Sequence, residues 1–514
     1  MSKTIIIIGA GLAGLSAALQ AAENGCNVKL VSSLPSERAQ SVMAEGGINA
    51  ALNTKDENDS PEEHFTDTIK AACGLADPNA VWGMTQAAPE LVHWLLKLGV
   101  KFNMSGYDDV DLRNFGGQKK KRTAFAQSDT GKQIMTAMID AVRRKEASGM
   151  VERFSHHSFL TLRLCGNICC GCVIRDEYSQ ETVELPGDAV IVATGGMHGL
   201  FGNTTGSLSN TGEVTAELFR LGVPLANGEM IQYHPTTVKC GGKRMLISEA
   251  ARGEGGRLFA MKDGKQWYFM EEKYPELGNL MPRDITAREI WKVSHESEVF
   301  LDMTEISEEI ISNKLSGLAD DCMTYLHKDI RKEPVSVLPG IHYFMGGILV
   351  DEQHRTPIQN LYAAGECCAQ YHGANRLGGN SLLGALYGGR VAAKSACEQA
   401  DGVVLSCAAQ IDIPPASQIS EIKQLNKVMQ ETMGVVRNEN TLLNGIQTVQ
   451  ALTGNLPLLG MAVLKSALAR KESRGAHWRE DYPKSNDDDY LKTTVARFDG
   501  KQIQISFVPV PERR

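Results

Sequence analysis

The sequence predicts an α/β protein: a Rossmann-like domain that is interrupted by an α+β capping domain and followed by a helical C-terminal domain. Two observations predict this arrangement. A short apolar strand at residues 5–8 (IIII) runs into a glycine-rich turn and a helix, and a strand-rich pattern stops near residue 231 and returns near residue 343. The first domain is therefore expected to comprise residues 1–230 and 343–413, the cap residues 231–342, and the C-terminal domain residues 414–514.

The N-terminal segment has the spacing of a dinucleotide cradle. Gly9, Gly11 and Gly14 follow the first strand and open the helix. In such a strand–turn–helix unit the glycines let the backbone approach a pyrophosphate, which rests on the helix N-terminus. The second strand ends in two serines, the first of them Ser32, where an acidic residue would hold the ribose of NAD. NAD is therefore not favoured, and the ribose must be held in another way.

Periodicity and turn signals predict the remaining elements in order. Residues 60–100 are expected to be helical, and Asp129 is expected to cap a helix through IMTAMIDAVRRK. Residues 151–184 predict a small meander of strands, and DAVIVATGG predicts a second buried strand that ends in a glycine pair. Charged helices such as PRDITAREIWKVS characterise the cap. From Pro414 the pattern is helical, and TVARFDGKQIQISFVPV predicts a closing edge hairpin that turns at Asp499.

Composition and charge limit the classes of function. The 514 residues exceed what one core holds, and 42% hydrophobic with 22% charged residues is an ordinary soluble composition. A net charge of −8 argues against nucleic acid, and the one compact basic run, residues 119–122 (KKKR), is expected to be a solvated loop. Neither a membrane-spanning apolar run nor a secretory signal is found. We expect a cytoplasmic protein that associates with a membrane, if at all, through a partner.

The 12 cysteines are expected to be reduced thiols packed in the interior. The segment CGNICCGC at residues 165–172 lacks a second CxxC pair at a zinc-like distance. A β-hairpin that turns at Gly166 and Asn167 is favoured there, with a metal or cluster as the weaker alternative. The sequence predicts no metal site.

A second set of segments supplies cations and one carboxylate in turn-prone contexts. The residues are His234 in QYHPT, Glu249 and Arg252 in SEAARGEGG, Arg283 in MPRD, His342 in HYFMGG, and Arg376 in HGANRLGGNSLLG. Three arginines, two histidines and a carboxylate suit the binding of a small dianion and the delivery of a proton to it. Together with the dinucleotide cradle, they predict a redox enzyme that acts on a short carboxylic acid.

These motifs resemble the flavoprotein subunits of the fumarate reductase/succinate dehydrogenase family. The resemblance covers nearly the whole chain, through IIIIGAGLAGLSAA, EGGINAAL, RNFGG, RTAFAQSDTG, DAVIVATGG, QYHPT, SEAARGEGG, MPRD, HYFMGG, LYAAGE, HGANRLGGNSL and ARKESRGAHWREDYP. The related L-aspartate oxidases share HPT, RGEG, PRD and HGANR. They resemble the chain less at RNFGG and RLGGNSL.

The resemblance implies FAD as the cofactor of the Rossmann-like domain. The positions that match flavin-lining residues of the family are Gly9, Gly11, Gly14, Ser32, Gly46, Gly47, Ala193, Gly195, Glu366, Ser381 and Leu382, together with Arg376, which the family uses chiefly for substrate. Many members attach FAD covalently to a histidine, and Gln40 occupies that position here. Glutamine cannot form the bond, so noncovalent FAD is expected. Because covalent attachment raises the flavin potential in the family, its absence favours alkene reduction.

The resemblance also implies a mechanism. His234, Ser248, His342 and Arg376 match carboxylate-binding positions, Arg283 matches the general acid, and Glu249 with Arg252 is expected to relay a proton to it. The leading hypothesis is reduction of fumarate, or a closely related unsaturated dicarboxylate, to succinate. The alternatives are an L-aspartate oxidase and a succinate dehydrogenase flavoprotein subunit that works with an iron–sulfur partner, since the chain itself has no cluster-spaced cysteines.

Overall fold

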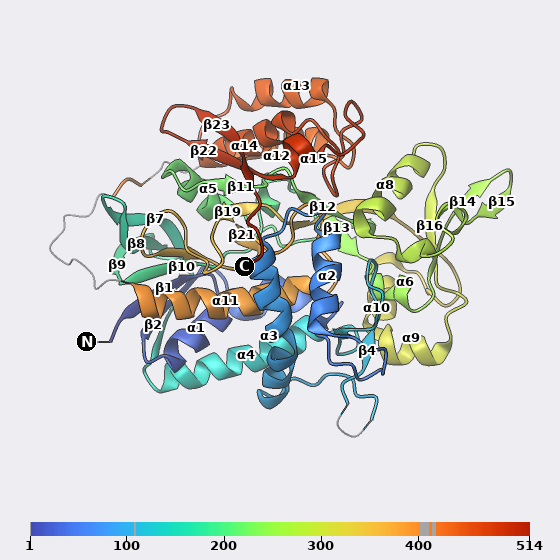
Figure 1. Cartoon of the computed structure of the whole chain (residues 1–514), viewed down its shortest axis with the longest axis horizontal. Helices are drawn as coiled ribbons and strands as arrows, with labels where there is room; N and C mark the ends of the chain where they lie inside the picture. The colour runs from blue at the N-terminus through green and yellow to red at the C-terminus, as the bar shows by residue number, and fades with distance from the viewer. Residues whose placement is uncertain (1, 107–108, 401–410, 414–417) are drawn as a thin grey trace.

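A five-stranded parallel sheet at the centre of the molecule is built from segments on both sides of the cap (Figure 1). In spatial order its strands are β20 (Leu361–Ala363), β10 (Ala189–Val192), β1 (Thr4–Ile8), β2 (Asn27–Ser32) and β6 (Val151–Ser155). The computed structural model describes residues 2–106, 109–400, 411–413 and 418–514. Because β20 follows the cap in sequence and pairs with β10, the chain leaves this sheet, forms the cap and returns. The predicted α/β class is confirmed.

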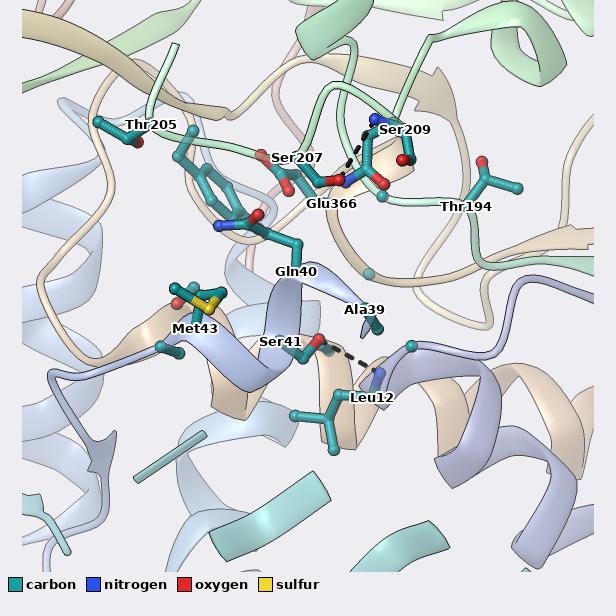
Figure 2. A pocket seen from close by; sticks show the side chains of 18 of the residues that line it. Leu12, Ala39, Gln40, Ser41, Met43, Thr194, Thr205, Ser207, Ser209 and Glu366 are labelled. Atoms are coloured by element: carbon teal, nitrogen blue, oxygen red, sulfur yellow. Dashed lines mark hydrogen bonds between the residues drawn. The ribbon is translucent and has the colours of Figure 1, made fainter. Parts of the chain in front are cut away.

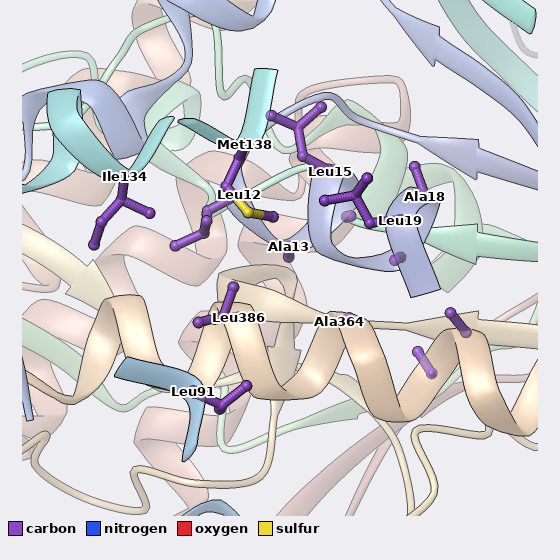
Figure 3. Close-up of a cluster of buried hydrophobic side chains, with 14 of the residues drawn as sticks. Leu12, Ala13, Leu15, Ala18, Leu19, Leu91, Ile134, Met138, Ala364 and Leu386 are labelled. Atoms are coloured by element: carbon purple, nitrogen blue, oxygen red, sulfur yellow. The ribbon is translucent and has the colours of Figure 1, made fainter. Parts of the chain in front are cut away.

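The sheet is covered on both faces, which explains why β1 is apolar from Ile5 to Ile8. Ile5 and Ile7 face α1 (Leu12–Glu23), α11 (Asn380–Gln399) and α4 (Thr130–Ala147), whose side chains form one core (Figure 3). Ile6 and Ile8 face the opposite way, into a second core. That core includes side chains of the meander β7 (His157–Cys165), β8 (Ile168–Asp176) and β9 (Thr182–Pro186).

The meander carries the cysteine-rich segment as predicted. β7 and β8 pair antiparallel around Gly166 and Asn167, and Cys169 and Cys172 are packed in the core. Within the described residues, no three histidine, cysteine or acidic side chains are grouped as ligands for a metal. The expectation of reduced thiols is wrong for Cys165, which is disulfide-bonded.

Two helices and a small sheet lie beside the central sheet. The helices are α2 (Pro61–Ala71) and α3 (Pro78–Lys97), and the strands are β3 (Ile48–Asn49), β5 (Thr123–Ala124) and β4 (Leu112–Arg113). Two expectations are corrected here. Asp129 occupies the N-cap of α4, but its side chain makes no capping hydrogen bond. The basic run is not wholly solvated, because Arg122 is fully buried and pairs with Asp59 and Asp67 at 2.8 and 2.9 Å.

The cap contains two further sheets and several short helices, coloured green to yellow in Figure 1. One sheet consists of β13 (Lys243–Leu246), β12 (Ile231–Cys240) and β18 (Leu338–Phe344), and the other of β15 (Lys265–Trp267), β14 (Arg257–Lys262), β16 (Val299–Asp302) and β17 (Val335–Ser336). The helices that bear on the site are α6 (Glu249–Gly253) and α8 (Arg283–Val293). The cap is therefore richer in strands than its charged helical segments suggested, while its exact bounds remain a prediction.

The C-terminal region is mainly helical and ends in the predicted hairpin. Its elements are α12 (Ile419–Thr432), α13 (Glu439–Val449), α14 (Asn455–Ala469), α15 (Asp487–Tyr490), β22 (Lys492–Phe498) and β23 (Ile503–Pro509). β22 pairs with β11 (Leu225–Ala226), so the last hairpin joins a sheet with strands from the middle of the chain. The predicted start of this domain at residue 414 lies outside the described residues. No described helix combines the length and the apolar character that crossing a bilayer requires.

A buried ionic cluster fixes the C-terminal region to the strand that carries part of the site. Arg470 donates to Glu229, three residues before Gln232 of β12, at 2.7 Å and to Glu472 at 2.8 Å, and all three charged side chains are inaccessible to solvent. The hydroxyl of Thr494 in β22 donates a hydrogen bond to Oε1 of Glu229 at 2.6 Å. Buried charges of this kind are stable only while each keeps its partners.

Replacing Arg470 by alanine should therefore lower the free energy of unfolding by about 3–5 kcal/mol, because it leaves the carboxylate of Glu229 buried without its cation, while Glu472 keeps its pair with Arg474. Urea titration followed by circular dichroism measures this. The matched control is Arg143→Ala, which removes an exposed pair with Glu37 and should change stability little. Equal stabilities of the two variants would contradict the role assigned to the cluster.

Candidate functional site

A cavity of about 560 Å3 collects residues from the central sheet, the cap and α11. It is lined by the predicted cofactor residues Gly9, Gly11, Ser32, Gly46, Gly47, Ala193, Gly195, Glu366, Ser381 and Leu382, and by the predicted substrate and catalytic residues His234, Ser248, Glu249, Arg283, His342 and Arg376. Gln40 also lines it, and Figure 2 shows its side chain among those of the cavity wall. Of the predicted site residues, Gly14 and Arg252 do not line the cavity.

The glycine-rich turn is shaped by close backbone contacts. Gly9 has a φ of +109°, and a Cβ there would lie 2.3 Å from the carbonyl oxygen of Ala193. A Cβ on Gly14 would lie 1.9 Å from the oxygen of Gly9, so Gly14 serves the packing of α1 against the turn rather than the cavity wall. Gly11 is the N-cap of α1 and has no side chain that could accept from the first amides of the helix. Gly11 therefore leaves these amides able to donate to a phosphate group, as at other helix N-termini that bind phosphate.

Other segments complete a cradle that fits a flavin dinucleotide. Gly47 has a φ of +137°, and a Cβ there would lie 2.5 Å from the oxygen of Ala124. Glu366 also lines the cavity, where its Oε1 accepts a hydrogen bond from the amide of Phe344 at 3.0 Å and its other oxygen can accept from hydroxyl groups. Ser41 accepts from the amide of Leu12 at 3.3 Å and thereby ties the turn before Gly46 to α1 (Figure 2).

A buried ion pair between α8 and α6 forms part of the cap wall. Arg283, the first residue of α8, donates from Nε and Nη2 to Oε2 of Glu249 at 2.8 and 2.6 Å. Its Nη1 donates to Oε1 of Gln232 at 3.1 Å. The guanidinium is thus held on two sides and is 6% exposed, so it has one orientation with respect to the cavity.

Glu249 also connects Arg283 to Arg252. Oε1 of Glu249 lies 3.5 Å from Nη2 of Arg252 and accepts a hydrogen bond from the amide of Gly116 at 3.0 Å. Glu249 and Arg252, three residues apart in α6, therefore lie on one face of this helix. Burial alone would raise the pKa of Glu249, but the charges of Arg283 and Arg252 outweigh burial and hold that pKa below its usual value. Glu249 is consequently an ionised bridge between two guanidinium groups.

Two histidines and a third arginine stand close to Arg283. The rings of His234 and His342 are 5.1 Å apart in a T-shaped arrangement, and Nδ1 of His342 lies 2.8 Å from the hydroxyl of Thr205. The guanidinium of Arg376 lies 4.3 Å from the centre of the Tyr343 ring. Nε2 of His234 and Nε of Arg376 are buried without a hydrogen-bond partner among the described residues, so both are available to a ligand.

The electrostatics of this cluster favour an anion. Burial, followed by the charge of Arg283, lowers the pKa of both His234 and His342 well below the ordinary value, so both rings are neutral near pH 7. Burial and Arg283 also lower the pKa of Arg376 to about 9, which leaves it charged at neutral pH. A bound carboxylate would relieve the repulsion between Arg283 and Arg376. The cluster can therefore hold a dicarboxylate by two cations and by neutral imidazole donors.

Ser248 is placed at the entrance to α6. Its hydroxyl accepts a hydrogen bond from the amide of Ala250 at 3.4 Å and so caps the helix that carries Glu249. The side chain is buried and lines the cavity, as does Glu45, with which its hydroxyl interacts. Its predicted contact with substrate is compatible with this position.

Three residues of the site were not singled out in the sequence. Gln232 orients Arg283 and also donates to Oδ1 of Asn375 at 3.0 Å and to the carbonyl of Arg376 at 2.9 Å. Tyr343 supports Arg376, and Thr205 holds His342. Gln232 and Tyr343 lie inside the motifs QYHPT and HYFMGG, beside residues that were predicted. Thr205 carried no signal, because its contact with His342 spans 137 positions of sequence.

Comparison with known proteins shows similarity over the segments that form the cavity. A family profile described as FAD binding domain matches residues 4–382, and one described as fumarate reductase flavoprotein C-term matches residues 452–513. The succinate dehydrogenase flavoprotein subunit of Bacillus subtilis (strain 168) is 38% identical, over 100% of this chain and 98% of that protein. The 8-methylmenaquinol:fumarate reductase flavoprotein subunit of Wolinella succinogenes is 32% identical, over 100% and 92%. A solved variant of E. coli quinol fumarate reductase FrdA superimposes with a TM-score of 0.90 at 28% identity, over 99% of this chain and 97% of that one.

The neutral state of His342 predicts a pH dependence of stability. Its pKa is ordinarily 6.5 and lies well below this in the folded protein, so the unfolded chain binds more protons below pH 6.5 and stability falls as the pH decreases. His342→Asn should remove part of this slope, up to about 1.4 kcal/mol per pH unit. Urea unfolding at several values between pH 6.5 and pH 5 measures it. The exposed His295→Asn serves as control, and equal slopes for wild type and His342→Asn would contradict the burial of a neutral imidazole.

Proposed function

Because the chain belongs to the succinate dehydrogenase/fumarate reductase flavoprotein family, we propose that it reduces fumarate, or a closely related unsaturated dicarboxylate, to succinate with FAD as cofactor. One observation carries this proposal. Arg283, fixed by Glu249 and Gln232, lines the same cavity as the glycine-rich turn and the neutral histidines. A fixed proton donor, a carboxylate-binding cluster and a flavin cradle are the three parts that saturation of an activated alkene requires.

The carboxylate-binding residues position the substrate and polarise it. Arg376 pairs with one carboxylate through its fork of N–H donors, and His234, His342 and Ser248 donate to the carboxylate oxygens. When bound, FAD supplies the hydride for one alkene carbon. The negative charge that then develops beside the carboxylate is stabilised by Arg376 and Arg283, in a site from which most water is excluded.

Arg283 delivers the proton to the second carbon. An arginine is a weak acid, with a pKa above about 12, but the acceptor is a carbanion-like carbon that is more basic still. Glu249 then accepts a proton from Arg252 and passes it to Arg283, since its two oxygens face these two guanidinium groups. The depressed pKa of Glu249 keeps it ionised between turnovers and ready to accept that proton.

We also propose that FAD is held without a covalent bond. Gln40 stands at the cavity wall where family members that attach the flavin have a histidine, and an amide nitrogen is not a nucleophile that forms such a bond. Noncovalent flavin has the lower potential in this family, which favours alkene reduction over succinate oxidation. Electrons for the reaction are proposed to come from an iron–sulfur partner, through which the protein would also associate with a membrane.

Succinate oxidation as part of a larger complex is the second candidate function. It is favoured by the 38% identity to the Bacillus subtilis protein, which is named a flavoprotein subunit of succinate dehydrogenase and is spanned over 98% of its length. L-aspartate oxidase is not favoured, because the relatives compared here carry succinate dehydrogenase or fumarate reductase names. Stopped-flow reoxidation of the reduced flavin by a panel of unsaturated acids, beside an assay for aspartate-dependent peroxide, separates the three activities.

Arg283→Ala should retain FAD but reduce fumarate turnover by at least about 1,000-fold, because the proton donor is lost while the cradle is intact. Anaerobic oxidation of a reduced viologen dye by fumarate measures the rate, and the flavin absorbance measures occupancy. Arg288→Ala is the matched control: it lies on the same helix and stacks on Trp478, outside the cavity. Normal turnover by Arg283→Ala would remove Arg283 from the mechanism.

Noncovalent attachment predicts that acid precipitation releases all of the flavin. After trichloroacetic acid treatment, the yellow colour should be in the supernatant and the protein pellet should be colourless, because no bond joins FAD to Gln40. Fluorescence of the protein band after denaturing electrophoresis should be absent for the same reason. A fluorescent band would overturn the assignment of Gln40.

A further inference from the structure

Two thiols that are far apart in sequence meet at the end of the central sheet opposite the cavity. Sγ of Cys26 lies 2.9 Å from Sγ of Cys397, although 371 positions separate the two residues. This is closer than two sulfur atoms approach without bonding, and less than about 1 Å beyond the disulfide bond length of about 2.0 Å. Cys26 is 5% exposed and Cys397 is half-buried, so Cys397 is the more accessible residue of the pair.

The pair joins the two helices that border the cavity at their other ends. Cys26 follows α1, and Cys397 lies in the last turn of α11. At the N-termini of the same helices, Gly11 and Ser381 line the cavity. The helices pack closely: a Cβ on Gly389 would lie 2.3 Å from the carbonyl oxygen of Ala13. A covalent link at one end would therefore restrain the separation of the helices at the other.

We propose that Cys26 and Cys397 form a redox-active dithiol that closes to a disulfide by exchange with a low-molecular-weight disulfide. Cys397, the more exposed thiol, attacks the small disulfide as its thiolate, forms a mixed disulfide and releases one small thiol. Cys26 then attacks Sγ of Cys397 and releases the second thiol. The two cysteine sulfurs lose two electrons and the small disulfide gains them, with both cysteine protons passing to the released thiols.

The surroundings of Cys397 set the rate of this exchange. Burial and the adjacent Cys26 raise the pKa of Cys397, while the nearby ammonium of Lys3 opposes this shift. Nζ of Lys3 is fixed in place by donating to the carbonyl of Cys397 at 2.7 Å. Closure is therefore slow in a reducing, neutral environment and proceeds when small disulfides accumulate.

Closure would retain the flavin in a protein that lacks a covalent attachment. The cross-link encloses most of the chain, and links that enclose long segments stabilise most because they restrict the unfolded state. The melting temperature of the FAD-loaded protein should rise by about 3–6 °C on closure. Release of FAD on heating should slow in parallel, because the N-termini of α1 and α11 separate less readily.

Treatment of the full-length, FAD-loaded protein with oxidised glutathione tests this proposal. Combined digestion with trypsin and a glutamate-specific protease isolates residues 24–29 and 395–398, each with one cysteine. Mass spectrometry without reduction should find the two peptides joined, and dithiothreitol should separate them and reverse the rise in melting temperature. Cys397→Ser should abolish both effects, and the matched control Cys73→Ser, at another half-buried thiol, should keep both.

Recovery of the two peptides unlinked after prolonged treatment, each with a free thiol or a glutathione adduct, would overturn the proposal. A joined pair without any change in melting temperature or flavin release would overturn its stabilising role. The peptide analysis uses the unaltered protein, so it decides the first question even if a variant fails to fold.

Discussion

The buried contact between Arg283 and Glu249 is the interaction on which the rest of the site depends. A carboxylate with almost no exposure would be neutral by itself, and two guanidinium groups keep it ionised. Glu249 accepts from Gly116, and Gln232 ties Arg283 to the segment that carries Arg376. One ion pair thus joins α6, α8 and β12 of the cap to loops that belong to the central domain.

The same interaction leaves positive charge in excess. Arg252, Arg283 and Arg376 are buried around the carboxylate of Glu249, the carboxylate of Glu366 also acts on Arg376, and the neighbouring histidines are neutral. A buried cation that these carboxylates do not balance is costly unless an anion completes it. Burial and the charge of Arg283 lower the pKa of Arg376, which shows that the charged form of Arg376 is destabilised. A bound anion would lower that cost, which agrees with the dicarboxylate substrate proposed above.

The sequence predicted elements better than it predicted their partners. The strand–turn–helix of the first 30 residues, the hairpin around Gly166 and the closing hairpin follow from local periodicity and turn residues, and all three are present. The residues of the ion pair were predicted through their motifs. What the sequence did not predict depends on contacts between distant segments: the role of Gln232, the support of His342 by Thr205, and the burial of Arg122 between two aspartates.

Gly14 is a residue whose role the sequence motif predicted incorrectly. Its place in the glycine motif predicted contact with the cofactor, whereas its position serves the approach of α1 to the first strand. Gly389 has the corresponding role where α11 meets α1. A larger side chain at either position would push a helix N-terminus away from the cavity without touching a ligand. No covalent bond to the flavin is expected at Gln40. The backbone of the glycine-rich turn must therefore help to retain the flavin, and Gly14 and Gly389 maintain that backbone by allowing close packing of α1 and α11.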